Sequence, residues 1–168
     1  MRPFSKRRYH RVGDLVGDVC ALWRDRAQVR AVMRGAAIDD VFRERLMLAV
    51  TEVNGCRYCS YAHARAALAA GLTRADVEAL AKGDLEGAPP DQAVALLYAR
   101  HWAETDGRPD TEIRAKVLEA YGEARTASIE LALRAIRVGN LTGNSWDYLL
   151  YRASGGRLGD TRPGRPAT

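Results

Sequence analysis

A Cys-x-x-Cys pair followed by a histidine is the clearest chemical signal in the chain. Cys56 and Cys59 are three residues apart, and His63 follows four residues after Cys59 in a run with helical periodicity. Positions three and four apart are neighbours on one face of a helix. The two thiols are then close enough to bridge, and the imidazole lies one turn beyond the second thiol. This is the arrangement that a dithiol redox catalyst needs.

The position of the pair in its helix favours this chemistry. We expect Cys56 in the first turn, where unpaired backbone N–H groups and the helix dipole stabilise a thiolate. His63 can take the proton of Cys59 or pair with its thiolate. A sulfenic acid on one sulfur can be attacked by the other to give a disulfide. A bridge between helix positions i and i+3 is strained, so it is easily reduced again.

Three other interpretations of the Cys-x-x-Cys pair compete with a redox dithiol on a helix. A thioredoxin-type motif belongs near a βαβ pattern, and the chain has no strand-like alternation. A structural zinc site needs four ligands, and the fourth would have to be Cys20 or His101 from elsewhere in the chain. Inert core cysteines are the remaining alternative. We therefore predict a redox dithiol with no metal and no organic cofactor, and we expect Cys20 to be a buried apolar residue.

The preceding helix offers two carboxylates as a base or proton reservoir. Glu44 has apolar neighbours at i−3, i+3 and i+4, so its face is apolar although it carries a carboxylate. Glu52 is nearer to the cysteines in sequence. Spacing alone does not decide between them.

The whole chain has the periodicity of an all-α protein. We predict a single-domain bundle of about seven helices over residues 12–154, preceded by a basic arm (1–11) and followed by a disordered tail (155–168). Capping residues and glycines place the helices. The predicted helices cover residues 13–34, 40–53, 56–70, 73–83, 91–106, 111–121 and 124 onward, the last broken around 139–143.

Composition excludes several classes of function. The chain has 168 residues, of which 47% are apolar and 28% charged, as in an ordinary globular domain. Much of the net charge of +5 lies at the ends, where residues 1–11 carry five Lys and Arg and no acidic residue. We interpret these ends as solvated, because no nucleic-acid-binding signature accompanies them. No apolar run approaches the roughly 18 residues of a membrane span, and no signal peptide is evident. We expect a cytoplasmic protein without nucleic-acid or membrane partners.

Two segments resemble a known family. The run from Glu44 to Leu72 (ERLMLAVTEVNGCRYCSYAHARAALAAGL) and the later GNLTGNSWDYLLYR are similar to alkylhydroperoxidase D, within the carboxymuconolactone decarboxylase superfamily. The resemblance implies that Glu44 is a relay carboxylate and His63 a relay histidine. It also implies that Cys59 reacts with peroxide and that Cys56 resolves the sulfenic acid.

The resemblance implies an AhpD-like, all-helical subunit that assembles into a homo-oligomer, a trimer or hexamer. It implies a peroxidase for hydrogen or organic peroxides, with a lipoyl-type or other dithiol protein as reductant. The family pattern has a histidine just before the second cysteine, where this chain has Tyr58, whose hydroxyl does not act as a base near neutral pH. Two other functions stay open: a carboxymuconolactone decarboxylase-type or lactone-processing enzyme, and a non-enzymatic redox sensor.

Overall fold

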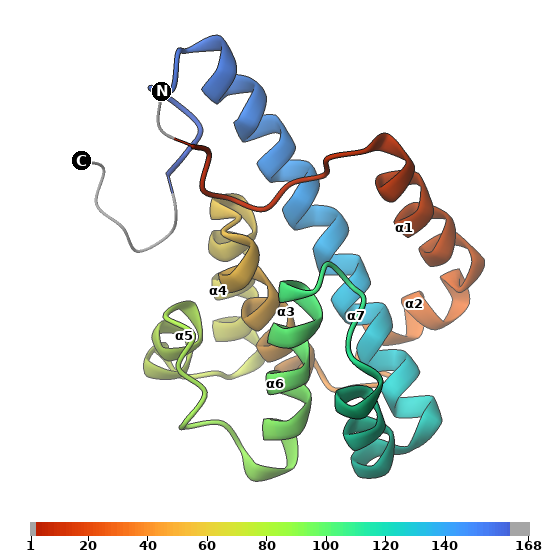
Figure 1. The fold of residues 1–168 in the computed structure, drawn as a ribbon. Helices are drawn as coiled ribbons and strands as arrows, with labels where there is room; N and C mark the ends of the chain where they lie inside the picture. The colour runs from red at the N-terminus through yellow and green to blue at the C-terminus, as the bar shows by residue number, and fades with distance from the viewer. Residues whose placement is uncertain (1–2, 162–168) are drawn as a thin grey trace.

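The computed structural model describes residues 3–161, and every regular element in that range is an α-helix (Figure 1). This confirms the predicted all-α fold. The seven helices are α1 (Val12–Arg24), α2 (Arg26–Met33), α3 (Asp40–Asn54), α4 (Arg57–Ala70), α5 (Arg74–Ala81), α6 (Pro90–Glu104) and α7 (Thr111–Ala153).

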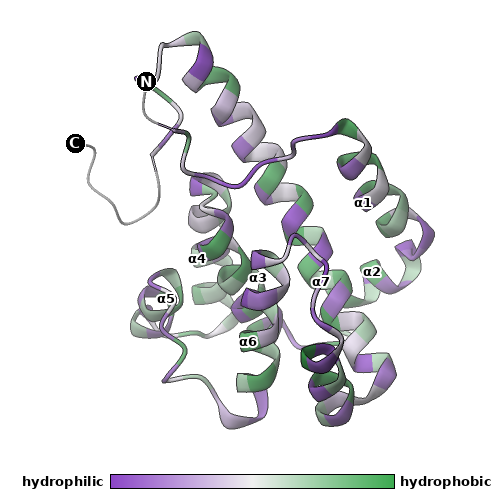
Figure 2. Ribbon diagram, viewed as in Figure 1, coloured by the Kyte–Doolittle hydropathy of each residue, from purple (hydrophilic) through white to green (hydrophobic). Residues whose placement is uncertain are grey.

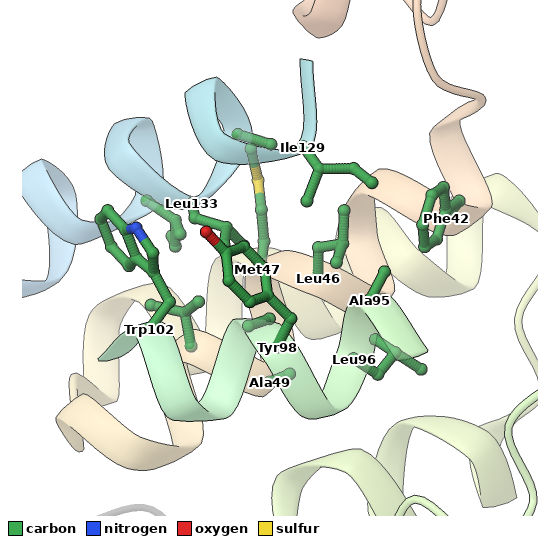
Figure 3. Close-up of a cluster of buried hydrophobic side chains, with 14 of the residues drawn as sticks. Phe42, Leu46, Met47, Ala49, Ala95, Leu96, Tyr98, Trp102, Ile129 and Leu133 are labelled. Carbon is green, nitrogen blue, oxygen red and sulfur yellow. The ribbon is translucent and has the colours of Figure 1, made fainter. Parts of the chain in front are cut away.

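Helix α3 is the centre of the bundle and contacts α4, α5, α6 and α7. Its residues 44–51 are all buried, as expected of a helix that other helices cover on several sides. By contrast, apolar and polar residues alternate along α7 (Figure 2), which has one buried face. Side chains of α3, α6 and α7 interlock in the main core (Figure 3), among them Phe42, Leu46, Tyr98, Trp102, Ile129 and Leu133.

The chain turns sharply between α3 and α4, as the sequence predicts. Asp39 caps α3 by accepting a hydrogen bond from the backbone N–H of Phe42 at 2.8 Å. Gly55 ends α3 with a φ of 73°, a left-handed conformation that glycine adopts without strain. Cys56 follows at once as the N-cap of α4. The first cysteine is therefore fixed to the end of the most deeply buried helix.

Two helix boundaries differ from the sequence prediction. The expected helix over 13–34 is interrupted at Asp25, where φ is −98° and ψ is 23°, and continues as α2. The expected break around 139–143 is wrong, because α7 runs unbroken through that segment to Ala153. The non-helical residue inside α7 is Gly122, with φ 72° and ψ 170°, where the sequence predicts a helix end.

The N-terminal arm passes over the start of α4 and crosses α7 between its two ends (Figure 1), and it is held there. Asn144 Nδ2 donates hydrogen bonds to the carbonyls of Arg7 (2.7 Å) and Asn54 (2.8 Å). Lys6 is buried. The interpretation of this arm as a solvated end is therefore wrong for Lys6, whose burial depends on partners far away in the sequence.

The start of the expected tail contacts the arm. The backbone N–H and hydroxyl of Ser5 both donate to Asp160, at 2.9 and 2.8 Å. Residues 162–168, the rest of that expected tail, lie outside the described residues. The division into arm, domain and tail at 11/12 and 154/155 stays a prediction. Within residues 3–161, no helix has the length and apolar character needed to cross a membrane.

Candidate functional site

The two cysteines are in contact at the start of α4. The Cys56 and Cys59 Sγ atoms are 2.7 Å apart, and both side chains are free thiols. The Cys59 backbone N–H donates to Cys56 Sγ at 3.3 Å, so the sulfur occupies the acceptor position of an N-cap. Cys56 is fully buried, whereas Cys59 is partly exposed. The second sulfur is therefore the one open to a reactant.

The contact makes one thiol of the pair acidic. When Cys56 is ionised, the Cys59 thiol donates a hydrogen bond to its thiolate, and this lowers the pKa of Cys56 to about 7, against the opposing effect of burial. The backbone N–H groups of Cys59 and Tyr58 and the charge of Lys6 lower it further. The pKa of Cys59 is raised, because Cys56 holds its proton and burial disfavours the charge. The pair thus loses its first proton near neutral pH, chiefly from Cys56.

Glu44 and His63 form a second contacting pair. His63 Nδ1 donates to Glu44 Oε2 at 2.7 Å, and Arg43 donates to Glu44 Oε1 at 3.1 and 3.0 Å. Burial would raise the pKa of Glu44, but the His63 and Arg43 contacts together outweigh it and lower the pKa. Glu44 is therefore a buried carboxylate that holds a proton on His63 Nδ1. Nε2 is left as the nitrogen that can accept a proton.

The four predicted site residues, Cys56, Cys59, His63 and Glu44, form these two separate pairs. Cys59 and His63 are one turn apart on α4, and within the described residues His63 makes no hydrogen bond to either sulfur. Of the two carboxylates considered from the sequence, Glu44 contacts His63. Glu52 instead lies beside Gly83, where its Oε2 would be 3.3 Å from an added Cβ.

Helix α7 forms a close wall behind the sulfurs. A Cβ on Gly143 would lie 3.2 Å from Cys56 Sγ, and one on Gly139 would lie 3.9 Å from Cys59 Sγ. Glycines four apart on one helix face therefore allow the close approach of α7 to α4. This explains why the segment that we predicted as a break is continuous helix.

Asn140 lies between these glycines and is a site residue that the sequence analysis missed. It is fully buried, accepts a hydrogen bond from Asn54 Nδ2 at 3.0 Å and donates to Thr51 Oγ1 at 3.2 Å. Its side chain also hydrogen-bonds Cys59 and lowers the pKa of that thiol. The available signal was Gly139 and Gly143 at helical spacing around a polar residue, a pattern typical of close helix contact.

Tyr58 of α4 belongs to a charged cluster around Asp147, which lies one turn after Gly143 on α7. Its hydroxyl donates to Asp147 at 3.1 Å, and Arg57 donates to the same oxygen at 2.9 Å. Lys6 contacts the other oxygen of Asp147 at 2.6 Å. Tyr58, which stands where the family pattern has a histidine, therefore contacts Asp147 rather than the Glu44–His63 pair.

The remaining candidates lie apart from this site. Cys20 is exposed on α1, so its expected burial is wrong, because α1 packs through its opposite face. His101 Nε2 lies 3.3 Å from a carboxylate oxygen of Asp110. In the part of the chain that the structure describes, no group of three or more His, Cys, Asp or Glu side chains could hold a metal ion.

The fold and the site together define an all-helical subunit with a paired-cysteine centre. A family model described as the carboxymuconolactone decarboxylase family matches residues 23–105, about half of the chain, including Glu44, Cys56, Cys59 and His63. The chain belongs to the carboxymuconolactone decarboxylase family, in agreement with its resemblance to alkylhydroperoxidase D. No curated protein and no solved structure gives a significant match to the chain.

Proposed function

We propose that the protein is a thiol-dependent peroxidase that reduces hydrogen or organic peroxides through a Cys56–Cys59 dithiol–disulfide cycle. The observation that carries the proposal is the 2.7 Å contact between the two sulfurs. A sulfenic acid on either sulfur would have its partner within immediate reach.

The first step oxidises the accessible sulfur. Cys59 attacks the terminal oxygen of the peroxide ROOH, the O–O bond breaks, and the proton of Cys59 passes to the Cys56 thiolate. Cys59 becomes a sulfenic acid, and the alkoxide RO⁻ leaves with a proton that His63 Nε2 has first accepted from solvent, which gives ROH. Glu44 holds His63 in the orientation for this transfer.

The second step forms the disulfide. Cys56 attacks the Cys59 sulfenic sulfur, the S–O bond breaks, and the hydroxyl leaves with the Cys56 proton as water. One peroxide is thus reduced by two electrons while two thiols become one disulfide. A dithiol reductant, such as a lipoyl-type protein, then exchanges with the partly exposed Cys59 and restores both thiols.

The surface of α1 supports an oligomer. Val12, Val16, Val19 and Trp23 follow at i, i+4, i+7 and i+11, and each is between 46% and 77% exposed. A row of apolar side chains at helical spacing is typical of a subunit interface. We propose a homo-oligomer, a trimer or hexamer, in the cytoplasm, where dithiol reductants are available.

Peroxide consumption with dithiothreitol as the dithiol tests the proposal. Cys59→Ser and His63→Gln should each abolish turnover, whereas Cys20→Ser, which removes the exposed third thiol, should leave it unchanged. Undiminished turnover in Cys59→Ser would contradict the role of this cysteine. Activity on a lactone that survives thiol alkylation would indicate the decarboxylase-type alternative. A single stoichiometric oxidation with a change in oligomer size would indicate a redox sensor.

A further inference from the structure

The ion pair between Lys6 and Asp147 is unusual in its depth. Both side chains are completely buried, and Lys6 Nζ is 2.6 Å from Asp147 Oδ2. Lysine is rarely buried without a charged partner, because desolvation of an ammonium group costs several kcal/mol. The other basic residues in the described part of the arm, Arg7, Arg8 and Arg11, are partly or fully exposed. The burial of Lys6 alone among these basic residues therefore has to be explained by its surroundings.

The ion pair lies next to the first cysteine. Gly143, against which the Cys56 sulfur packs, precedes Asp147 by one turn of α7, about 5.4 Å along the helix axis. Asp147 also binds Arg57, the residue directly after Cys56. Two cations and one carboxylate thus meet beside Cys56. The cluster has a surplus positive charge that a Cys56 thiolate would balance.

The arm is tied to the turn that carries Cys56. The Arg7 backbone N–H donates to the carbonyl of Asn54 at 3.3 Å. Asn144 joins the same two residues by donating to both of their carbonyls. Asn54 is two residues before Cys56, so these contacts place Lys6 at a fixed position relative to the site.

We propose that Lys6 is a positioning residue of the dithiol site, whose ammonium group, held by Asp147, stabilises the Cys56 thiolate when the arm is docked. The inference rests on the proposed dithiol chemistry and adds the arm to it. A protein with an undocked arm would have a less reactive thiol pair at neutral pH.

Among residues 3–161, the charged and titratable groups around Cys56 come from three segments. Helix α4 contributes Arg57 and Tyr58, and Cys59 is on the same helix. Helix α7 contributes Asp147. From the arm, Lys6 contributes a charge that lowers the pKa of Cys56. The guanidinium group of the next arm residue turns away to Asp106.

Thiolate absorbance at 240 nm between pH 5 and 9 tests the proposal on the full chain, in a Cys20→Ser background. Lys6→Gln keeps a donor for Asp147 but removes the charge, so the titration midpoint should rise by about one pH unit. The thiolate fraction at pH 6 then falls about tenfold. Lys6→Arg should keep a midpoint close to that of the parent. Arg11→Gln removes a charge from an exposed position of the same arm and should change nothing.

An unchanged midpoint in Lys6→Gln overturns the proposal, and so do equal shifts in the Gln and Arg variants, which would indicate packing rather than charge. Far-UV circular dichroism checks folding. If Lys6→Gln does not fold, Asp147→Asn replaces it: loss of the carboxylate should lower the midpoint, and a rise overturns the proposal. Thiolate absorbance does not depend on peroxide turnover. The titration therefore tests the role of Lys6 even if the protein has no peroxidase activity, and the two failures can be told apart.

Discussion

Gly143 of α7 packs directly against Cys56 of α4, so that a side chain at position 143 would begin 3.2 Å from the cysteine sulfur. Contacts this short require the neighbour to move, and Cys56 is fixed as the N-cap of its helix. The backbone of α7 is therefore the rear wall of the site.

Substitution of Gly143 by alanine should disturb this wall. We expect Gly143→Ala to lower the free energy of unfolding by about 1–3 kcal/mol, the usual cost of overpacking, and to reduce peroxide turnover. Gly139→Ala is the matched control, since its Cβ would lie at an ordinary 3.9 Å from Cys59 Sγ. Alanine also favours a helix over glycine by up to about 1 kcal/mol. Urea unfolding measures both variants, and equal stabilities would contradict the close contact.

Asn140→Ala should be among the more destabilising substitutions in α7. It leaves Asn54 and Thr51 without their partner in a fully buried position, at a cost of about 1–3 kcal/mol in the free energy of unfolding. It also removes the hydrogen bond that lowers the pKa of Cys59. Ser145→Ala, which loses only a bond to the carbonyl of Leu141 in its own helix, should cost less than about 0.5 kcal/mol. The prediction fails if urea unfolding gives the two variants the same stability.

Glu44 should make the stability of the protein depend on acid pH. Its pKa in the folded state is lowered below the unfolded value of about 4.3, so its ionised form stabilises the fold above that pH. This contribution, about 1.5–3 kcal/mol for hydrogen bonds to a charged group, is lost as the pH falls through the folded-state value. Urea midpoints between pH 3 and 6 should therefore change less in Glu44→Gln than in the parent.

Glu52→Gln is the control for that measurement. Glu52 is on the same helix, but its carboxylate lies beside Gly83 and not beside His63. The variant should keep the parental difference between pH 3 and 6. If the urea midpoint of Glu44→Gln changes between pH 3 and 6 as much as that of the parent, Glu44 is not the source of the pH dependence.

The reactivity of the thiols should follow the titration of the cysteine pair. With the pKa of Cys56 at about 7, the thiolate fraction rises about tenfold from pH 6 to pH 8 and then levels off. In Cys56→Ser the partner that raises the pKa of Cys59 is absent, so the remaining thiol should titrate nearer the ordinary value of about 8.5. Thiol alkylation by iodoacetamide against pH measures both proteins, each in a Cys20→Ser background that removes the exposed third thiol. The same midpoint in both would show that the acidity does not arise from the pair.

Sequence reasoning was reliable where the structure depends on local signals. The all-α fold follows from periodicity, and the turn between α3 and α4 follows from Gly55 and the residues around it. The contact of Cys56 with Cys59 follows from their spacing at the start of a helix. Each of these features is determined within a few residues of chain.

The rest depends on contacts between residues far apart in the chain. Gly139 and Gly143 have the same local appearance in a helix break and in a close helix contact, and only the position of α4 distinguishes the two. The partners Lys6 and Asp147 are 141 residues apart, so no local pattern could have linked them. The exposure of Cys20 depends on which face of α1 packs against α7.

Because α7 is continuous, the α7 side of the thiol site is more rigid than the α4 side. Its core residues Ile129 and Leu133 and the glycine behind Cys56 belong to one uninterrupted helical rod, about 20 Å long from Ile129 to Gly143. The rod is anchored in the packed interior, so it does not yield when the bond between the sulfurs forms. Any backbone adjustment during the cycle must come from the opposite side, in the first turn of α4.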